Sequence, residues 1–218
     1  DDQAVLFVAN HSGLLPWDGL LLAETVAAAH GEARRPRFLI ADWLITLPFV
    51  QPAMARLGGV RACPENAERL LATERSVVAF PEGVKGAAKS FKDRYRLQRF
   101  GRGGAVRLAL AAEVPVVPVA IVGAEEAHPI LFRVETPARA LGLPFLPVTP
   151  TFPWLGPLGA VPLPAKWVIS FGEPLATPPH GPEAARDDLL VARLTEELRS
   201  EVQRLVKEAL AIRQGVFT

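Results

Sequence analysis

The sequence contains very little cysteine and no excess of either charge. Cys63 is the single cysteine in 218 residues, so no internal disulfide can form and no site with several cysteine ligands is possible. A reducing compartment is therefore expected. The 24 Lys and Arg residues nearly balance the 23 Asp and Glu residues, which leaves a net charge of +1. Because no basic field covers the whole chain, nucleic acid is not an expected partner.

The beginning of the chain lacks a methionine, a positively charged segment and an apolar run of the signal-peptide type. We expect a processed or trimmed chain, for which an N-terminal membrane anchor outside this sequence stays an open alternative.

Short apolar runs alternate with helix-like stretches along the chain, which predicts an α/β fold. We expect one domain over residues 1–218, with a largely parallel central sheet and helices on both faces. The stretch 42–57 is expected to be helical but broken by Pro48 and Pro52. The predicted strands are 4–9, 37–41, 76–80, 114–122 and 166–171, and the predicted helices are 18–30, 64–73, 103–113 and the amphipathic 183–212.

Residues 140–165 contain no charged side chain over 26 positions, a length that could span a bilayer as a helix. Seven of these residues are proline, and each proline inside a helix costs about 3 kcal/mol, so a spanning helix is rejected. Two alternatives stay open: a proline-rich loop packed over the core, or an apolar lid or membrane-facing segment. The second would carry Phe145, Phe152, Trp154 and Leu155.

His11 and Asp18 flank a turn between the first predicted strand and the first predicted helix. Loops of this kind lie at the carboxyl edge of an α/β sheet, where ligands bind. A neutral imidazole there can accept a proton, and a carboxylate on its other nitrogen fixes the tautomer. The ordinary alternative is that Asp18 caps the helix and His11 bonds to backbone. The chain has no G-x-S-x-G motif to supply a nucleophile.

Four ordered blocks of sequence resemble the glycerolipid and lysophospholipid acyltransferase superfamily. They are NHSGLLPWD (10–18), GGVRACPENAERLL (58–71), FPEGVKG (80–86) and VPVVPVAIVGAEE (114–126), with FGEPL (171–175) as a later motif. The resemblance covers about residues 5–175. Six residues separate His11 from Asp18 where the superfamily usually has four, a longer form similar to the monoacylglycerol-acyltransferase-like branch.

The resemblance implies transfer of a fatty acyl group from acyl-CoA or an acyl carrier protein to a lipid hydroxyl. His11 would be the general base and Asp18 would orient it, without an acyl-enzyme. Glu82 would hold hydroxyls of the acceptor, while Phe80, Pro81 and Gly83 shape the turn. Lys85 stands where the superfamily usually has arginine, and Arg61 is a loose match to an arginine that contacts phosphate. No metal and no resident cofactor are expected.

The stretch 85–104 is basic, and its default interpretation is a solvated loop. Two functional alternatives are docking of coenzyme A phosphates or an acidic carrier protein, and attraction to anionic lipid. The cations are Lys85, Lys89, Lys92, Arg94, Arg96, Arg99 and Arg102.

The favoured interpretation is a peripheral membrane acyltransferase on the cytoplasmic side of a membrane, with a lipid acceptor, the acyl donor and the membrane surface as partners. One rival is a thioesterase or lipid hydrolase in which His11 activates water. The other is a non-catalytic lipid-binding protein.

Overall fold

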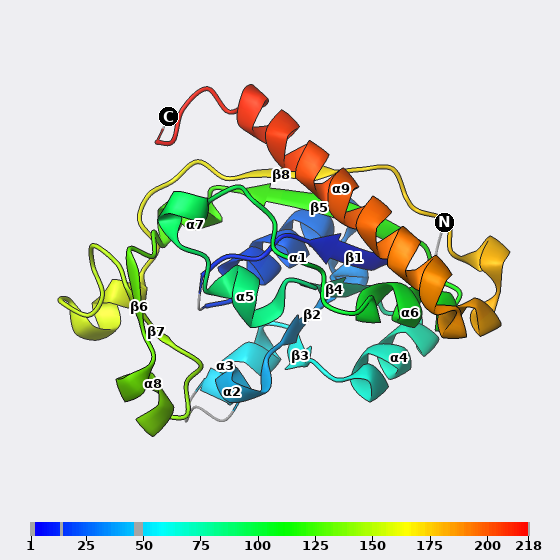
Figure 1. Cartoon of the computed structure of the whole chain (residues 1–218), viewed down its shortest axis with the longest axis horizontal. Helices are drawn as coiled ribbons and strands as arrows, with labels where there is room; N and C mark the ends of the chain where they lie inside the picture. The colour runs from blue at the N-terminus through cyan, green and yellow to red at the C-terminus, as the bar shows by residue number, and fades with distance from the viewer. Residues whose placement is uncertain (1–2, 14, 46–49, 218) are drawn as a thin grey trace.

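A six-stranded sheet forms the centre of the molecule in the computed structural model, which describes residues 3–13, 15–45 and 50–217 (Figure 1). The strand order is β3-β2-β4-β1-β5-β8, and only β8 runs antiparallel to its neighbour. The prediction of a largely parallel sheet is confirmed. The bounds are β1 Leu6–Ala9, β2 Arg37–Ile40, β3 Gly59–Arg61, β4 Val77–Ala79, β5 Val116–Val122 and β8 Val168–Phe171.

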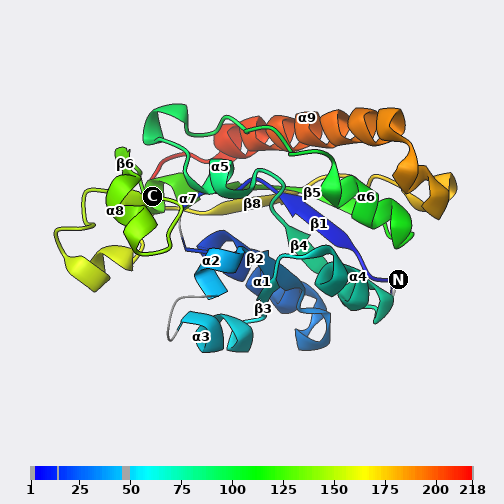
Figure 2. The same cartoon turned by 60° about the horizontal axis from the view of Figure 1, so that its bottom comes forward.

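Helices cover both faces of this sheet, as predicted (Figure 2). On one face lie α1 (Trp17–His30), α2 (Asp42–Ile45) and α3 (Val50–Arg56). They pack against the strand side chains that point to this face, because successive residues of a strand point to opposite faces of the sheet. On the opposite face lie α4 (Pro64–Ala72), α6 (Gly104–Ala111) and α9 (Asp188–Ile212). Strand β1 contributes Phe7 to the first core and Leu6 to the second.

Two helix boundaries differ from the sequence prediction for identifiable reasons. Pro52 does not break α3 but lies in its first turn, where a missing N–H costs no intrahelical bond. Pro48 lies outside the described residues. The closing helix begins at Asp188 and not at 183, because the Asp187 carboxylate accepts from the N–H groups of Leu189 and Leu190, both at 3.0 Å. Residues Pro182–Arg186 form a separate 3-10 turn, η5.

The five parallel strands place the loops that follow them at one edge of the sheet. These loops follow β1, β2, β3, β4 and β5, and two of them continue into the short helices α5 (Gly83–Ala87) and α7 (Ala124–Ala127). Asn10 ties two of these strand ends together, because its amide donates to the Ile121 carbonyl at 2.8 Å and accepts from the Ile121 N–H at 2.7 Å. The candidate site lies at this edge.

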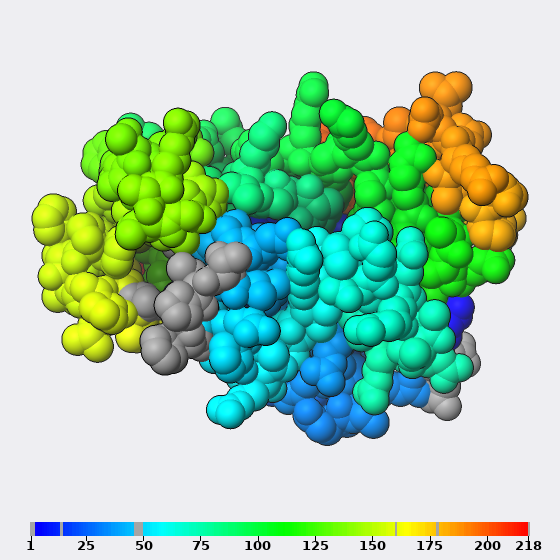
Figure 3. Space-filling model, turned by 90° about the horizontal axis from the view of Figure 1, so that it is seen from below, coloured from blue at the N-terminus to red at the C-terminus, as the bar shows by residue number. Residues whose placement is uncertain are grey.

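A two-stranded sheet that the sequence prediction missed projects at one end (Figures 1 and 3). It comprises β6 (Phe132–Val134), α8 (Thr136–Ala140) and β7 (Leu146–Val148), followed by the 3-10 turn η3 (Gly156–Ala160). Strand β7 falls inside the proline-rich segment. Phe145 is buried against Ala88 and Ile130, so this side chain follows the alternative of a loop packed over the core and not that of an exposed apolar surface. None of the helices in the described ranges combines the length and the hydropathy needed to cross a bilayer.

Candidate active site

His11 and Asp18 meet across the loop that joins β1 to α1. The Nδ1 atom of His11 lies 2.6 Å from Oδ2 of Asp18, and the Asp18 side chain is 1% exposed. The second ring nitrogen, Nε2, has no partner among the described residues. The ring of His11 stacks on Phe80, with centroids 4.6 Å apart at 29°. This pairing leaves Nε2 as the nitrogen able to exchange a proton with a ligand.

Asp18 is held in place by the first turn of α1. Helix α1 begins at Trp17 after Pro16, so Asp18 is not the capping residue that the alternative interpretation required. Its Oδ1 accepts from the Gly19 N–H at 2.8 Å, and its Oδ2 accepts from the Ser12 N–H at 3.2 Å. A carboxylate in this position also interacts favourably with the helix dipole. Two backbone donors therefore fix the carboxylate that orients His11.

The surroundings of His11 raise its pKa above the usual 6.5. Burial is the largest influence and by itself lowers the pKa, because a charged imidazolium loses solvation. The negative charge and hydrogen bond of Asp18, together with the charge of Glu82, outweigh burial and the opposing charge of Lys89. The site therefore favours the protonated ring, as a base that must take up a proton requires.

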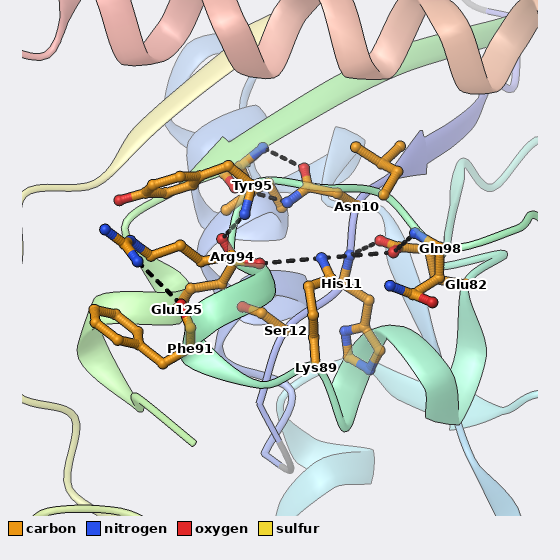
Figure 4. A network of polar contacts seen from close by, with 12 residues as sticks. Asn10, His11, Ser12, Glu82, Lys89, Phe91, Arg94, Tyr95, Gln98 and Glu125 are labelled. Atoms are coloured by element: carbon orange, nitrogen blue, oxygen red, sulfur yellow. Dashed lines mark hydrogen bonds and ion pairs between the residues drawn. The ribbon is translucent and has the colours of Figure 1, made fainter. Parts of the chain in front are cut away.

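Glu82 is buried inside the protein, where its carboxylate binds the main chain of His11 and of Gln98. Its Oε1 accepts from the backbone N–H of His11 at 2.9 Å, and its Oε2 accepts from the backbone N–H of Gln98 at 2.5 Å (Figure 4). The side chain is fully buried. This placement differs from the prediction that Glu82 holds hydroxyls of an acceptor, because both oxygens already accept bonds from the protein.

A mainly apolar cavity of about 710 Å³ opens beside His11 and extends between α4 and α6. Its volume lies in the range typical of small-molecule sites. Phe80, Pro81 and Gly83 line it. Cys63 also lies on its wall and is half-buried. Small and aliphatic side chains dominate farther along, including Ala67, Ala105, Leu108, Ala111 and Ala185.

A family profile described as Acyltransferase matches residues 1–122, more than half of the chain. This chain belongs to the acyltransferase family. It is 46% identical over 216 residues to uncharacterized proteins of Mycobacterium tuberculosis and Mycobacterium bovis, and 47% identical over 212 residues to one of Mycobacterium leprae. Those alignments cover 97–99% of this chain but 58–60% of the relatives, so the chain spans about three fifths of their length.

The fold of this acyltransferase is similar to that of a solved structure. The crystal structure of the 1-acyl-sn-glycerophosphate acyltransferase PlsC from Thermotoga maritima matches with a TM-score of 0.59 and 20% identity. The match covers 99% of this chain and 69% of that one. The family match confirms the expected acyltransferase superfamily, and the likeness of fold confirms the α/β class.

Two predicted binding residues of the acyltransferase lie away from the cavity wall. Arg61 ends β3 and forms a two-bond ion pair with Asp42, at 2.8 and 2.9 Å, on an exposed surface. Lys85 is exposed on α5 and does not line the cavity. The cations on the wall are Arg102 and Arg107, and Arg107 is bound to Asp188 and to the Ala185 carbonyl.

Lys89 and Glu125 form a buried pair that the sequence analysis did not identify. Lys89 was assigned to a solvated basic loop, but its side chain is 2% exposed and its Nζ lies 3.0 Å from Oε1 of Glu125. The same Nζ lies 3.5 Å from Oε2 of Glu82. Glu125 could have been predicted, because it follows the end of β5 at the same edge of the sheet as His11. Lys89 could not, because nothing in the sequence sets it apart from the other cations of the basic stretch.

Proposed function

We propose that this acyltransferase moves a fatty acyl group from acyl-CoA or an acyl carrier protein to a hydroxyl of a neutral glycerolipid. The observation that carries the proposal is that His11, hydrogen-bonded to Asp18, lies on the wall of an apolar cavity. Family membership supports acyl transfer, and the fold likeness to PlsC is consistent with a glycerolipid acceptor.

In the proposed step, Nε2 of His11 takes the proton of the acceptor hydroxyl, and the oxygen attacks the thioester carbonyl. A C–O ester bond forms and the C–S bond breaks. The departing thiolate takes the proton back from the imidazolium, which Asp18 stabilises in the interval. No acyl-enzyme and no metal ion take part in this step. A chain of methylenes would occupy the apolar wall between α4 and α6.

The charges of the cavity wall favour a neutral acceptor over a phosphate monoester. Phosphate is usually held by several convergent cations. In the described part of the chain the wall carries Arg102 and the already engaged Arg107, together with the acidic Glu68. Arg61 is engaged by Asp42 on the outer surface.

Thiol release from a long-chain acyl-CoA tests the proposal directly. We expect thiol release to depend on an added monoacylglycerol. The rate with monoacylglycerol should be at least about tenfold higher than with glycerol phosphate or a lysophosphatidic acid, which corresponds to a preference of about 1.4 kcal/mol. A parallel arm with acyl carrier protein identifies the donor. Acceptor-independent release would favour the hydrolase, and a preference for the phosphate acceptors would contradict the neutral-acceptor proposal.

The proposal includes a membrane-facing surface on the β6–β7 hairpin and the segment that follows it. Phe132 is 70% exposed, Trp154 is 74% exposed and Leu158 is 70% exposed, while Phe152 is half-buried. Leu131, Val134, Leu141, Leu155 and Val161 add exposed apolar area.

Basic side chains stand beside this hairpin surface. The Phe91 N–H donates to the Ile130 carbonyl at 2.8 Å, which brings the exposed Lys92 and Arg94 next to the hairpin that carries Arg133. An apolar surface with neighbouring cations suits an anionic lipid membrane, where each cation contributes about 1 kcal/mol.

Vesicle co-sedimentation checks this surface. We expect Trp154→Ser combined with Leu158→Ser to weaken binding to anionic vesicles by roughly tenfold or more, because two large apolar side chains no longer enter the lipid. The matched control is Leu189→Ser, which removes a leucine that is 85% exposed at the start of α9, away from the hairpin (Figure 1). Equal binding by all three proteins would refute the proposed surface.

A further inference from the structure

The carboxylate of Glu82 holds two chain segments that are far apart in the sequence. One oxygen accepts from the backbone of His11 and the other from the backbone of Gln98. The position of the His11 main chain, and hence of its ring, therefore depends on where Glu82 is held. Gly86 allows this close packing, since a Cβ at that position would lie 2.5 Å from Cβ of Glu82 and 3.2 Å from Cβ of His11.

Lys89 lies between Glu82 and Glu125 (Figure 4). All three side chains are buried, and a buried charge is costly unless a partner compensates it. Glu82 and Glu125 share the ammonium group, which holds both carboxylates at fixed distances. Burial raises the pKa of Glu125 above its usual value despite the charge of Lys89. Loss of the lysine would leave the buried carboxylates of Glu82 and Glu125 without their shared cation.

Glu125 also fixes the loop that supplies the second donor to Glu82. Its Oε2 accepts from the N–H of Tyr95 at 2.8 Å. Tyr95 has a φ of +65°, a left-handed conformation that costs a residue with a side chain roughly 1–2 kcal/mol. Gln203 of α9 accepts from the Leu97 N–H at 3.0 Å and donates to the Tyr95 carbonyl at 2.8 Å. Such a conformation is kept only where surrounding contacts impose it.

We propose that Lys89 and Glu125 are a positioning pair for the acyltransferase reaction: they fix Glu82, which fixes the backbone of His11 and so aims its ring at the cavity. This inference rests on the proposed function for its kinetic readout. Neither residue lines the cavity, so the role proposed for the pair is to position His11 and not to bind the substrates.

Kinetics of Lys89→Met, Glu125→Gln and the double variant test the pair. We expect Lys89→Met to lower kcat by about 10- to 100-fold, as a small displacement of a reacting group does, with KM within about threefold of wild type. The double variant should recover at least about threefold of kcat over Lys89→Met, because Glu125 is then neutral and no longer repels the carboxylate of Glu82. A purely structural role predicts additive losses and no recovery.

The titration of His11 supplies a readout that does not need turnover. The charged groups that face His11 are Asp18 of α1, Glu82, and Lys89, and Arg199 of α9 in turn acts on Glu82. Since the charge of Lys89 lowers the pKa of His11, Lys89→Met should move the titration midpoint of the ring, measured by NMR, to higher pH. His11→Ala assigns the signal among the four histidines.

Two control variants separate positioning from lost stability. Lys207→Met removes an exposed lysine of α9, and Val26→Ala opens a small cavity at the far end of α1. Both should keep kcat and the His11 titration at wild-type values. The inference is overturned if Lys89→Met loses no more kcat than Val26→Ala at equal stability, or leaves the His11 titration unchanged. If the wild-type protein shows no acyl transfer but Lys89→Met still shifts the His11 titration, the positioning pair is supported and the proposed function is refuted.

Discussion

Replacement of His11 by alanine is expected to abolish acceptor-dependent thiol release, with a loss of about 10²–10⁴-fold in kcat/KM, the usual contribution of a general base. The fold should survive this change. The bond from Glu82 to residue 11 uses the backbone N–H, which alanine retains. Asp18 also keeps its bonds from the N–H groups of Ser12 and Gly19. A loss of rate without a matching loss of thermal stability therefore assigns the effect to the imidazole.

His30→Ala is the matched control for this experiment. His30 ends the same helix that carries Asp18, and it is exposed far from the cavity. It should release thiol at the wild-type rate. If His11→Ala keeps acceptor-dependent turnover, the proposed mechanism is wrong. If it loses turnover but still binds lipid, the non-catalytic alternative fails, because a binding protein has no rate to lose.

The elements that position the histidine were predictable because they depend on local patterns. The apolar run before His11 and the helical spacing after Pro16 place a strand end and a helix start around the loop. Parallel strands then bring their carboxyl ends to one edge, which collects the loops after β1, β4 and β5. The turn residues Phe80, Pro81 and Gly83 line the cavity for the same reason.

Ion pairs between residues that are far apart in the sequence could not be predicted. From the sequence, Lys89 resembles the other cations of the basic loop, and Arg61 resembles an arginine without an ion-pair partner. The fold buries Lys89 between two carboxylates and pairs Arg61 with Asp42 at the surface. Strand β6 was also missed, because Phe132, Arg133 and Val134 are all exposed and show no buried face. Burial of Phe145 depends on Ala88 and Ile130, which lie elsewhere along the chain.

Replacing Asp18 by asparagine should cost about as much as removing the histidine, about 10²–10⁴-fold in kcat/KM, because the ring is then held in the wrong tautomer. The carboxylate accepts on both oxygens, from His11 and Ser12 on one and from Gly19 on the other. An amide has one oxygen. If that oxygen stays with Gly19, the NH₂ group faces Nδ1 of His11 and forces the proton onto Nε2, where a base needs a lone pair. If the amide turns round, its NH₂ group opposes the Gly19 N–H inside a buried turn.

The residual activity of Asp18→Asn should also shift in pH. In the wild type, Asp18 contributes to raising the pKa of His11, so the acid limb of kcat/KM should lie above pH 6.5 and activity should rise as the ring loses its proton. Asparagine removes that negative charge while burial still opposes the imidazolium, so the limb must move to lower pH. A pH–rate profile of both proteins checks this direction. A limb that moves upward, or does not move, would show that the titrating group is not His11 paired with Asp18.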